Sequence, residues 1–366
     1  MNFQLTKEQE FVQKMVREFA KTEVEPLAAE IDQEHRFPVE TVEKMAKYGL
    51  LGIPFPTKYG GMGGDEVSYS ITVSELAKVC ASTSVIVSAH TSLCCWPIYK
   101  YGTEDQKMKY LPELLSGKKL GAFGLTEPNA GTDASGQQTR AELDGDEWVL
   151  NGAKCFITNG GYAEVFVVMA MTDKSKGNHG ISAFIVEKND PGFSIGKTED
   201  KMGICASSTT ELIFQNCRIP KDRLLGGLGK GFKVAMQTLD GGRIGIASQA
   251  LGIAEGALEV TIEYMKQRKQ FGKKLAQMQA LQFVVADLAT KVEAAKLLVL
   301  KSAFCEDAGL PYGVPAAMAK LFAAETAMEV TTKCVQLHGG YGYTKDYPRR
   351  SDPRAPAPQG GDLLRP

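Results

Sequence analysis

Histidine is scarce in this sequence, and cysteine is scattered. The 366 residues include four histidines, which lie far apart, and eight cysteines that form no C-x-x-C pair. Neither residue type occurs at the spacing of a structural zinc site, so a metal centre or a histidine-activated nucleophile is not expected. Because several cysteines lie within apolar runs, the sequence predicts reduced thiols that pack as small hydrophobic side chains.

An excess of one charge and long apolar runs are missing as well. Lys and Arg number 42 against 43 Asp and Glu, and the formal net charge is −1. This balance excludes the broad cationic surface of a sequence-independent nucleic-acid-binding protein. No run approaches the roughly 20 apolar residues that span a bilayer, and the N-terminus shows no charged-then-apolar leader. We therefore expect a cytoplasmic protein that binds neither membranes nor nucleic acid.

The residues that are present change in pattern twice, which predicts an α+β protein of several domains. Residues 1–120 follow helical spacing, and residues 121–230 consist of short β-type runs. Residues 231–348 return to helical spacing, and residues 349–366 form a tail rich in Pro and Arg. The predicted organisation is an N-terminal α-helical domain, a middle antiparallel β-sheet or barrel domain, and a C-terminal four-helix bundle.

Local patterns support this division. Thr6 and Gln9 have the spacing of a helix capping box. Asn151-Gly152 and Asn159-Gly160 are strong turn patterns between β-type runs, and no G-x-G-x-x-G sequence indicates a βαβ unit that binds dinucleotides. An apolar seam at alternating steps of four and three residues predicts helix packing in the last domain. Its members are Leu281, Val285, Leu288, Val292, Ala295 and Val299.

Four segments combine glycine with polar or aromatic residues: Gly124–Asp133, Asp240–Arg243, Arg268–Gly272 and Gln336–Tyr343. The first can turn N–H groups and hydroxyls toward a flat or anionic ligand, but ordinary turns have the same composition. The basic residues of the third also complement the C-terminal dipole of a helix. Taken singly, each segment fits a structural role as well as a binding role.

Together, in this order and spacing, the segments resemble the acyl-CoA dehydrogenase family, and within it the short-chain, butyryl-CoA-type enzymes of bacteria. The resemblance runs from the N-terminus to about Pro348. Its most specific stretches are residues 122–135, 156–160, 239–244, 268–272 and 336–343. It implies the fold of that family, with FAD bound between the β domain and the C-terminal helices.

The resemblance also implies which residues hold FAD. They are Phe123, Leu125, Thr126, Thr132, Phe156, Thr158, Arg268, Phe271, Gln279, Gln336, Gly339 and Gly340. Thr126 and Thr158 would hydrogen-bond to the flavin and Phe156 would stack on it, while the guanidinium of Arg268 suits a pyrophosphate. We therefore expect Gly124–Thr132 and Arg268 to lie close enough to hold a dinucleotide between them. In the family, the segment from Gln336 to Gly340 reaches the FAD of a neighbouring subunit, which implies a homotetramer built as a dimer of dimers.

By the same resemblance, the activity is α,β-dehydrogenation of a short-chain acyl-CoA, of the butyryl-CoA to crotonyl-CoA type. Thr132, Asp240 and Arg243 would contact the acyl-CoA. A carboxylate removes the α-proton while the β-hydrogen leaves as hydride, and donors to the thioester oxygen stabilise the developing charge. The electrons then pass to electron-transfer flavoprotein.

The glutamate expected as the catalytic base is missing from the sequence. The family's base is normally a glutamate shortly after the Gly-Gly-Tyr-Gly-Tyr segment, yet no glutamate follows Glu329. Other branches carry the base on the helix that starts near Asp240, where this chain has Gly242. No residue is therefore assigned as the catalytic base.

Three explanations for the tail stay open at the level of sequence. The tail is a frameshifted remnant of a normal enzyme, or it is a true truncation that removes a base worth about 10² to 10⁴ in rate, or Asp352 or Asp362 serves instead. The alternative to an active dehydrogenase is accordingly a catalytically impaired homologue that binds FAD and acyl-CoA. A remoter alternative is a relative that passes electrons to oxygen.

Overall fold

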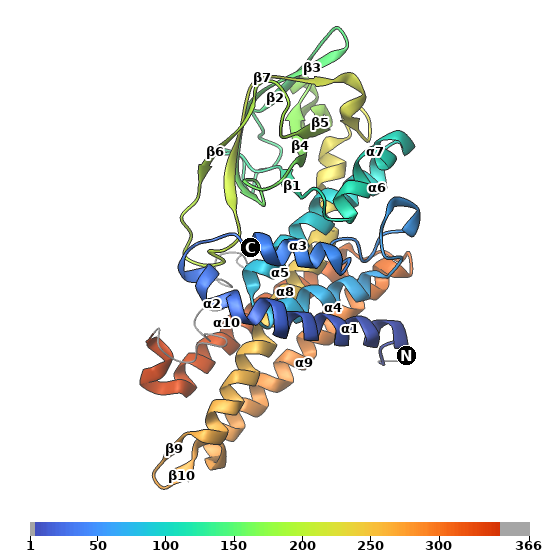
Figure 1. Ribbon diagram of the computed structural model, residues 1–366. Coiled ribbons are helices and arrows are strands. Elements are labelled where there is room, and N and C mark those ends of the chain that lie inside the picture. The colour runs from blue at the N-terminus through green and yellow to red at the C-terminus, as the bar shows by residue number, and fades with distance from the viewer. Residues whose placement is uncertain (1–3, 345–366) are drawn as a thin grey trace.

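Residues 4–344 are described by the computed structural model, which confirms the predicted succession of helices, β domain and helices (Figure 1). The β domain stands at one end of the molecule, and helix α8 (Gly231–Gln267) runs from it to the opposite end. This one helix therefore connects the two regions in which the candidate residues lie.

One N-terminal helix is buried on all sides, between neighbouring N-terminal helices and two of the long C-terminal helices. Every residue of α4 (Glu66–Ala77) is buried, although several are polar. Three of its hydroxyl groups have hydrogen-bond partners inside the protein: Ser70 Oγ pairs with Ser248 Oγ of α8 at 2.7 Å, Thr72 donates to the carbonyl oxygen of Ser68, and Tyr69 contacts Ser88. These polar groups are therefore buried without losing their hydrogen bonds. The other helices of this part are α1 (Lys7–Phe19), η1 (Ala20–Val24), α2 (Glu25–Gln33), α3 (Val39–Lys47), η2 (Thr57–Tyr59), α5 (Ala81–Ser88), η3 (Ala89–Cys95), α6 (Trp96–Tyr101) and α7 (Glu104–Leu115).

The predicted capping box is confirmed at the start of α1. The hydroxyl oxygen of Thr6 accepts a hydrogen bond from the N–H of Gln9 at 3.2 Å, and the Gln9 side chain accepts one from the N–H of Thr6 at 3.0 Å. Thr103 and Gln106 form the same arrangement at the start of α7. Both boxes satisfy N–H groups that a helix otherwise leaves free.

The middle domain is a sheet in the order β6-β7-β3-β2-β4-β5-β8, with β1 paired to β4. Most ladders are antiparallel as predicted, but β1 and β2 each pair with β4 in parallel. The connection from β1 to β4 is made by the β2–β3 hairpin rather than by a helix. The strands are β1 (Gly121–Gly124), β2 (Arg140–Asp144), β3 (Glu147–Thr158), β4 (Val165–Met171), β5 (Ile181–Glu187), β6 (Phe193–Thr198), β7 (Thr209–Pro220) and β8 (Leu224–Leu225), with the 3₁₀ turns η4 (Lys174–Gly180) and η5 (Lys221–Arg223).

Strand β4 joins the β domain to the helices. Its side chains alternate between two cores, as the pleat of a strand requires. Val165, Val167 and Met169 pack in a cluster with residues of η3 and α7, and Phe166 and Val168 pack in the core of the sheet. The β domain is therefore fixed against the helices by a strand with no solvent-exposed side.

The C-terminal stretch contributes three long helices among the described residues, where the sequence predicted a bundle of four. Besides α8 these are α9 (Gln279–Asp307) and α10 (Gly313–His338). The N-terminal α4 packs against α8 and α9. The remaining elements are β9 (Lys269–Gln270), β10 (Lys273–Lys274), η6 (Leu275–Gln277) and η7 (Gly339–Tyr343). The apolar seam of α9 is confirmed for its middle residues, which are Leu288, Val292, Ala295 and Val299.

Glycines allow α8 to approach α4 at van der Waals distance. A Cβ added to Gly252 would lie 2.2 Å from the carbonyl oxygen of Ser74, and one added to Gly256 would lie 2.3 Å from that of Lys78. Neither backbone oxygen can move without moving α4. The position of α8, which carries the candidate residues Asp240 and Arg243, therefore depends on these two glycines.

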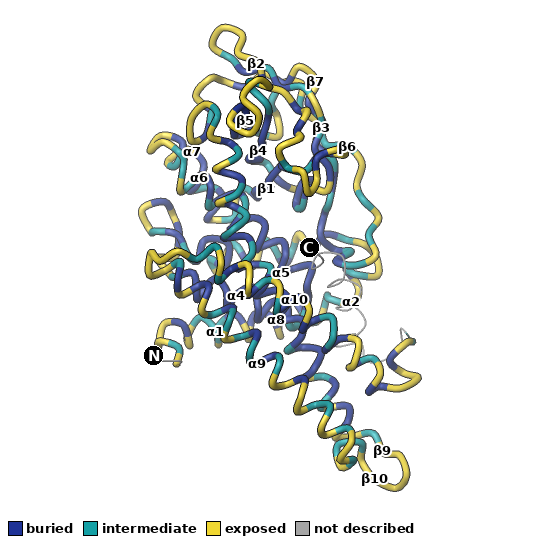
Figure 2. The backbone as a smooth tube through the Cα atoms, turned by 180° about the vertical axis from the view of Figure 1, so that it is seen from behind, coloured by how far each residue is buried: buried dark blue, intermediate teal, exposed yellow. Residues whose placement is uncertain are grey.

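Two further predictions can be compared with the structure. All eight cysteines are free, and all except Cys205 are buried, which confirms the predicted thiols. Among residues 4–344, no helix is long and apolar enough to cross a membrane. Figure 2 shows that exposed residues concentrate in loops and in the β9–β10 arm, whereas α4, α5 and the first half of α8 are largely buried.

Candidate functional site

The loop after β1 packs beside the first third of α8. Phe123 and Leu125 are both buried, and they belong to the same apolar cluster as Leu239 of α8. Thr126 is half-buried, while Thr132 is exposed. The β1 end of the loop and the turn of α8 that carries Asp240 thus share one apolar cluster.

Strand β3 forms the other side of the candidate site, and its pairing with β7 is irregular there. Its pairing with β7 shifts between Lys154 and Ile157, and Phe156 between them has a left-handed φ of 59°. Phe156 is also 63% exposed, an unusual state for a large aromatic residue with a strained backbone. The N–H of Cys155 donates to the carbonyl oxygen of Thr126 at 2.9 Å, so the irregularity and the loop are neighbours.

Helix α8 presents a polar turn to the same region. Asp240 and Arg243 form an ion pair one turn apart. A Cβ on Gly242 would lie 2.8 Å from Leu93 Cδ2, whereas one on Gly241 would come no nearer than 4.0 Å to Glu306 Oε2 and the hydroxyl of Tyr312. Asp240 and Arg243 are therefore together as predicted, and Gly242 faces η3.

Sequence reasoning missed a group of buried carboxyl groups behind this turn. The carboxylate of Asp307 accepts hydrogen bonds from the N–H groups of Glu66 and Val67 at 2.7 and 3.2 Å, and so caps α4 from the end of α9. Glu306 accepts a 3.0 Å hydrogen bond from Trp96 Nε1. No local pattern could reveal the cap, because its partners are about 240 residues apart in the chain.

Burial perturbs the acidity of this group. It raises the pKa of Glu306 to about 7, with a further contribution from the charge of Asp307. Burial also raises the pKa of Glu66, and the charges of Glu306 and Asp307 add to that effect. In the folded chain these carboxyl groups therefore hold protons at a pH where unfolded glutamates are ionised.

This shift predicts that stability falls as the pH rises from about 4.5 to 7. Between these values the folded chain binds more protons at Glu306 than the unfolded chain does, so the free energy of unfolding decreases with pH by at most about 3 kcal/mol. Glu306→Gln keeps an oxygen for Trp96 Nε1 and removes the ionisation. We expect the variant to be more stable than the wild type at pH 8 and to have a flatter profile. Urea unfolding from pH 5 to 8 measures this, with the exposed Glu263→Gln as control; an unchanged pH profile in Glu306→Gln would contradict the assignment.

The arm at the other end of α8 holds the remaining candidate residues. Arg268 lies over the ring of Tyr341 at 5.5 Å, and Phe271 is 94% exposed with a left-handed φ of 52°. Gln279 begins α9, and Gln336, Gly339 and Gly340 lie at the junction of α10 and η7. The structure therefore brings these residues together at one end of the helical bundle.

The two sets of candidate residues do not meet within one chain, and here the expectation from sequence was wrong. Arg268 follows Arg243 by 25 residues along α8, which at 1.5 Å per residue corresponds to about 40 Å. Strand β1, which leads into Gly124–Thr132, lies at the β-domain side of the molecule, whereas β9, which follows Arg268, lies at the opposite end (Figure 1). Sequence spacing could not show this, because one uninterrupted helix separates the motifs.

A cavity that the sequence did not indicate lies beside the start of α8. Its volume is about 560 Å³, and its lining includes Lys176, His179 and Lys230 together with Thr172 and Asp173. Glu142 lines it as well, and the ammonium of Lys176 pairs with Asp173 at 2.9 Å, so the lining carries charges of both signs.

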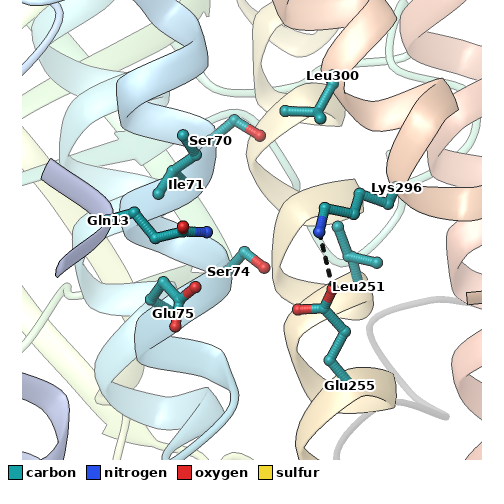
Figure 3. Close-up of a pocket in the computed structure, with 9 residues that line it drawn as sticks. All are labelled: Gln13, Ser70, Ile71, Ser74, Glu75, Leu251, Glu255, Lys296 and Leu300. Carbon is teal, nitrogen blue, oxygen red and sulfur yellow. Dashed lines mark ion pairs between the residues drawn. The ribbon is translucent and has the colours of Figure 1, made fainter. Parts of the chain in front are cut away.

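A second cavity lies within the helical bundle between α1, α4, α8 and α9 (Figure 3). It measures about 30 Å³, and the Lys296–Glu255 ion pair of 3.9 Å crosses its edge. This volume suits one or two water molecules and no larger ligand.

Comparison with known proteins shows which family the chain belongs to. The acyl-CoA dehydrogenase N-terminal, middle and C-terminal domain models match residues 6–118, 122–217 and 229–352. The chain is 62% identical over 348 residues to a short-chain specific acyl-CoA dehydrogenase of Clostridium acetobutylicum, covering 95% of this chain and 92% of that protein. It is 52% identical over 352 residues to the short-chain specific acyl-CoA dehydrogenase of Megasphaera elsdenii, with the same shares covered.

Solved structures of related proteins have the same fold. Butyryl-CoA dehydrogenase from Megasphaera elsdenii superposes with a TM-score of 0.94 at 49% identity, covering 100% of both chains. A chain in the structure described as the electron transferring flavoprotein of Acidaminococcus fermentans gives a TM-score of 0.96 at 54% identity, covering 99% of this chain and 94% of that one. The chain therefore belongs to the acyl-CoA dehydrogenase family of FAD-dependent oxidoreductases.

Proposed function

We propose that the chain oxidises short-chain acyl-CoA thioesters, of the butyryl-CoA to crotonyl-CoA type, and passes the electrons to electron-transfer flavoprotein. The observation that carries the proposal is the exposed ring of Phe156, which the irregularity of β3 holds beside the Thr126 loop. The high identity to short-chain relatives supports this substrate class.

The residues of this region fit a flavin. Phe156 offers a flat apolar surface, and Thr126 and Thr158 offer half-buried hydroxyls that hydrogen-bond to no residue between 4 and 344. Three such groups match a ring that has apolar faces and a polar edge. Bound FAD would supply the hydride acceptor of the reaction. Phe123 and Leu125 then act from behind the loop, by packing it on the helices.

We further propose that a second copy of the chain completes this site. The Arg268 arm lies far from Phe156 within one chain, so a dinucleotide held by both needs the arm of another copy. Exposed large apolar side chains available for such contacts lie along α9 and α10: Phe283, Phe304, Val314, Met318 and Leu321. Exposed apolar side chains are typical of subunit interfaces when they form a continuous patch. Light scattering is expected to give a homotetramer, and a stable monomer that retains FAD would contradict this arrangement.

Arg268→Ala is expected to weaken FAD binding by about 10- to 100-fold, because a charge-assisted hydrogen bond to phosphate contributes about 1.5–3 kcal/mol. The dissociation constant of FAD, measured by flavin fluorescence during titration of the apoprotein, gives the effect directly. Lys273→Ala removes a charge from the same arm at an exposed position and serves as the control. If both substitutions weaken FAD binding equally, Arg268 contributes only its positive charge and no specific hydrogen bond to the phosphate.

For the acyl-CoA we propose contacts with Thr132, Asp240 and Arg243. The α8 turn brings Asp240 and Arg243 together, and the cavity with Lys176, His179 and Lys230 follows at the start of the same helix. Lys176 pairs with Asp173 there, which leaves Lys230 and the N-terminus of α8 as the groups that suit the phosphates of the CoA nucleotide. The acyl end would then point along α8 toward Gly242.

No catalytic base is assigned. The segment after Pro348, including Asp352 and Asp362, lies outside the described residues, and Gly242 has no side chain to serve. The test is turnover of butyryl-CoA with an artificial electron acceptor, followed by detection of crotonyl-CoA. Product formation supports the dehydrogenase, bound flavin and ligand without product would indicate the impaired homologue, and hydrogen peroxide would indicate transfer to oxygen.

A further inference from the structure

A lysine is fully buried next to the candidate flavin site. Lys154 of β3 has no exposed side-chain surface, and its ammonium makes three hydrogen bonds. Nζ donates to the carbonyl oxygen of Leu125 at 3.1 Å, to Glu127 Oε1 at 2.7 Å and to Gln137 Oε1 at 3.1 Å. All three N–H groups of the ammonium are therefore used, and each acceptor lies in the segment between β1 and β2.

Glu127 extends this contact to the beginning of β2. Its carboxylate also accepts hydrogen bonds from the N–H of Gln138 at 2.7 Å and from the N–H of Thr139 at 3.1 Å. The backbone of Glu127 pairs with that of Ala130 in both directions at 3.1 Å, which closes the loop. The Lys154–Glu127 ion pair thus connects β3, both ends of the loop and the start of β2.

Stability alone does not explain a buried ion pair at this place, because apolar side chains of similar size commonly stabilise a core equally well. Directed donors and acceptors do fix distances, which apolar contacts do not. Lys154 lies two residues before Phe156, and the carbonyl that it binds belongs to the peptide unit that leads into Thr126. The ammonium therefore lies between the two segments that face the proposed flavin.

We propose that Lys154 is a positioning residue. It sets the distance between Thr126 on the loop and Phe156 on β3, and so keeps the space between them wide enough for the flavin ring. The inference rests on the proposed function, since it requires that FAD bind between these segments. Lys154 itself does not touch the reacting atoms and acts through Leu125 and Glu127.

The protonation state of Lys154 should make FAD affinity depend on pH. A side chain that only fills space in the core would not have this effect. Burial lowers its pKa to about 8, against the opposing attraction of Glu127, and Cys155 is the other titratable group beside it. Burial would raise the pKa of Glu127, but the lysine charge and its hydrogen bonds outweigh this and keep that pKa below the ordinary value. Above about pH 8 the neutral amine has two N–H groups for three acceptors. FAD affinity should therefore decline as the pH passes through this value.

The test compares FAD binding by the full-length wild type and by Lys154→Met/Glu127→Gln, in which both charges are removed so that neither is left unpaired. The expected result is a folded tetramer that binds FAD about tenfold more weakly or worse, with an altered flavin absorption band and no decline in affinity between pH 7 and 9. The control is Lys78→Met/Glu255→Gln, which removes a largely buried ion pair of 2.8 Å between the C-cap residue of α4 and helix α8. The control should keep the FAD affinity and the pH profile of the wild type.

Each outcome separates the two proposals. Wild-type affinity, spectrum and pH profile in the Lys154→Met/Glu127→Gln variant would overturn the positioning role while leaving the proposed function intact. Equal losses in both double variants would also overturn it, since any interior ion pair would then have the same effect. A folded wild-type protein that binds no FAD would overturn the proposed function first.

Discussion

Replacing Lys154 alone by Met is expected to lower the free energy of unfolding by about 3–5 kcal/mol, because it leaves a buried carboxylate without its cation. The Glu127 side chain is 5% exposed and that of Lys154 is 0% exposed. In the variant, Glu127 keeps only the two backbone N–H groups of Gln138 and Thr139. The alternative for the chain is to protonate Glu127, and this costs free energy at neutral pH.

A double-mutant cycle measures the coupling between the two side chains. Urea unfolding of the wild type, Lys154→Met, Glu127→Gln and the double variant gives the four free energies needed. We expect the double variant to recover at least half of the loss of Lys154→Met, and the loss itself to shrink at acidic pH. A loss below about 1 kcal/mol, or two additive single effects, would show that the ion pair is not the constraint that its burial indicates.

The Gly252→Ala/Gly256→Ala variant is expected to be less stable than the wild type by about 2–4 kcal/mol, although alanine favours a helix by up to about 1 kcal/mol per position. The added methyl groups would approach the carbonyl oxygens of Ser74 and Lys78 to 2.2 and 2.3 Å. Because these are backbone atoms of the α4 end, relief requires that the two helices separate. The separation would also displace the Asp240–Arg243 turn of α8.

A glycine on the same helix provides the control. A Cβ at Gly241 has no neighbour nearer than 4.0 Å, so Gly241→Ala is expected to be neutral or to stabilise by up to about 1 kcal/mol. Thermal unfolding of both variants distinguishes contact with α4 from a general intolerance of alanine. Destabilisation of equal size in Gly241→Ala would contradict the account of close helix packing.

The parts of the fold that could be predicted from sequence depend on local patterns. The capping box at Thr6 needs residues three apart, and the buried middle of α9 needs only its repeat of apolar residues. Asp240 and Arg243 meet because one helical turn separates them. Such interactions are set within a few residues of chain, and the sequence displays them.

Other features depend on contacts between distant segments, and sequence reasoning could not supply them. Asp307 caps a helix that begins 241 residues earlier, and Lys154 finds its acceptors 17 to 29 residues away. The separation of Arg268 from Gly124–Thr132 follows from the unbroken length of α8. The Arg268 and Gly124–Thr132 motifs were visible in the sequence, whereas Asp307 and Lys154 belong to no local pattern. In all three cases packing between distant segments decides which groups meet.

The FAD content of the purified full-length protein, together with the response of its flavin absorption band to butyryl-CoA, tests the central claim most directly. The account predicts an equimolar amount of bound FAD and a change of that band on adding butyryl-CoA, because hydride transfer requires both ligands to lie in contact at one site. A folded protein that neither carries FAD nor takes it up when supplied, and whose spectrum butyryl-CoA leaves unchanged, would contradict it.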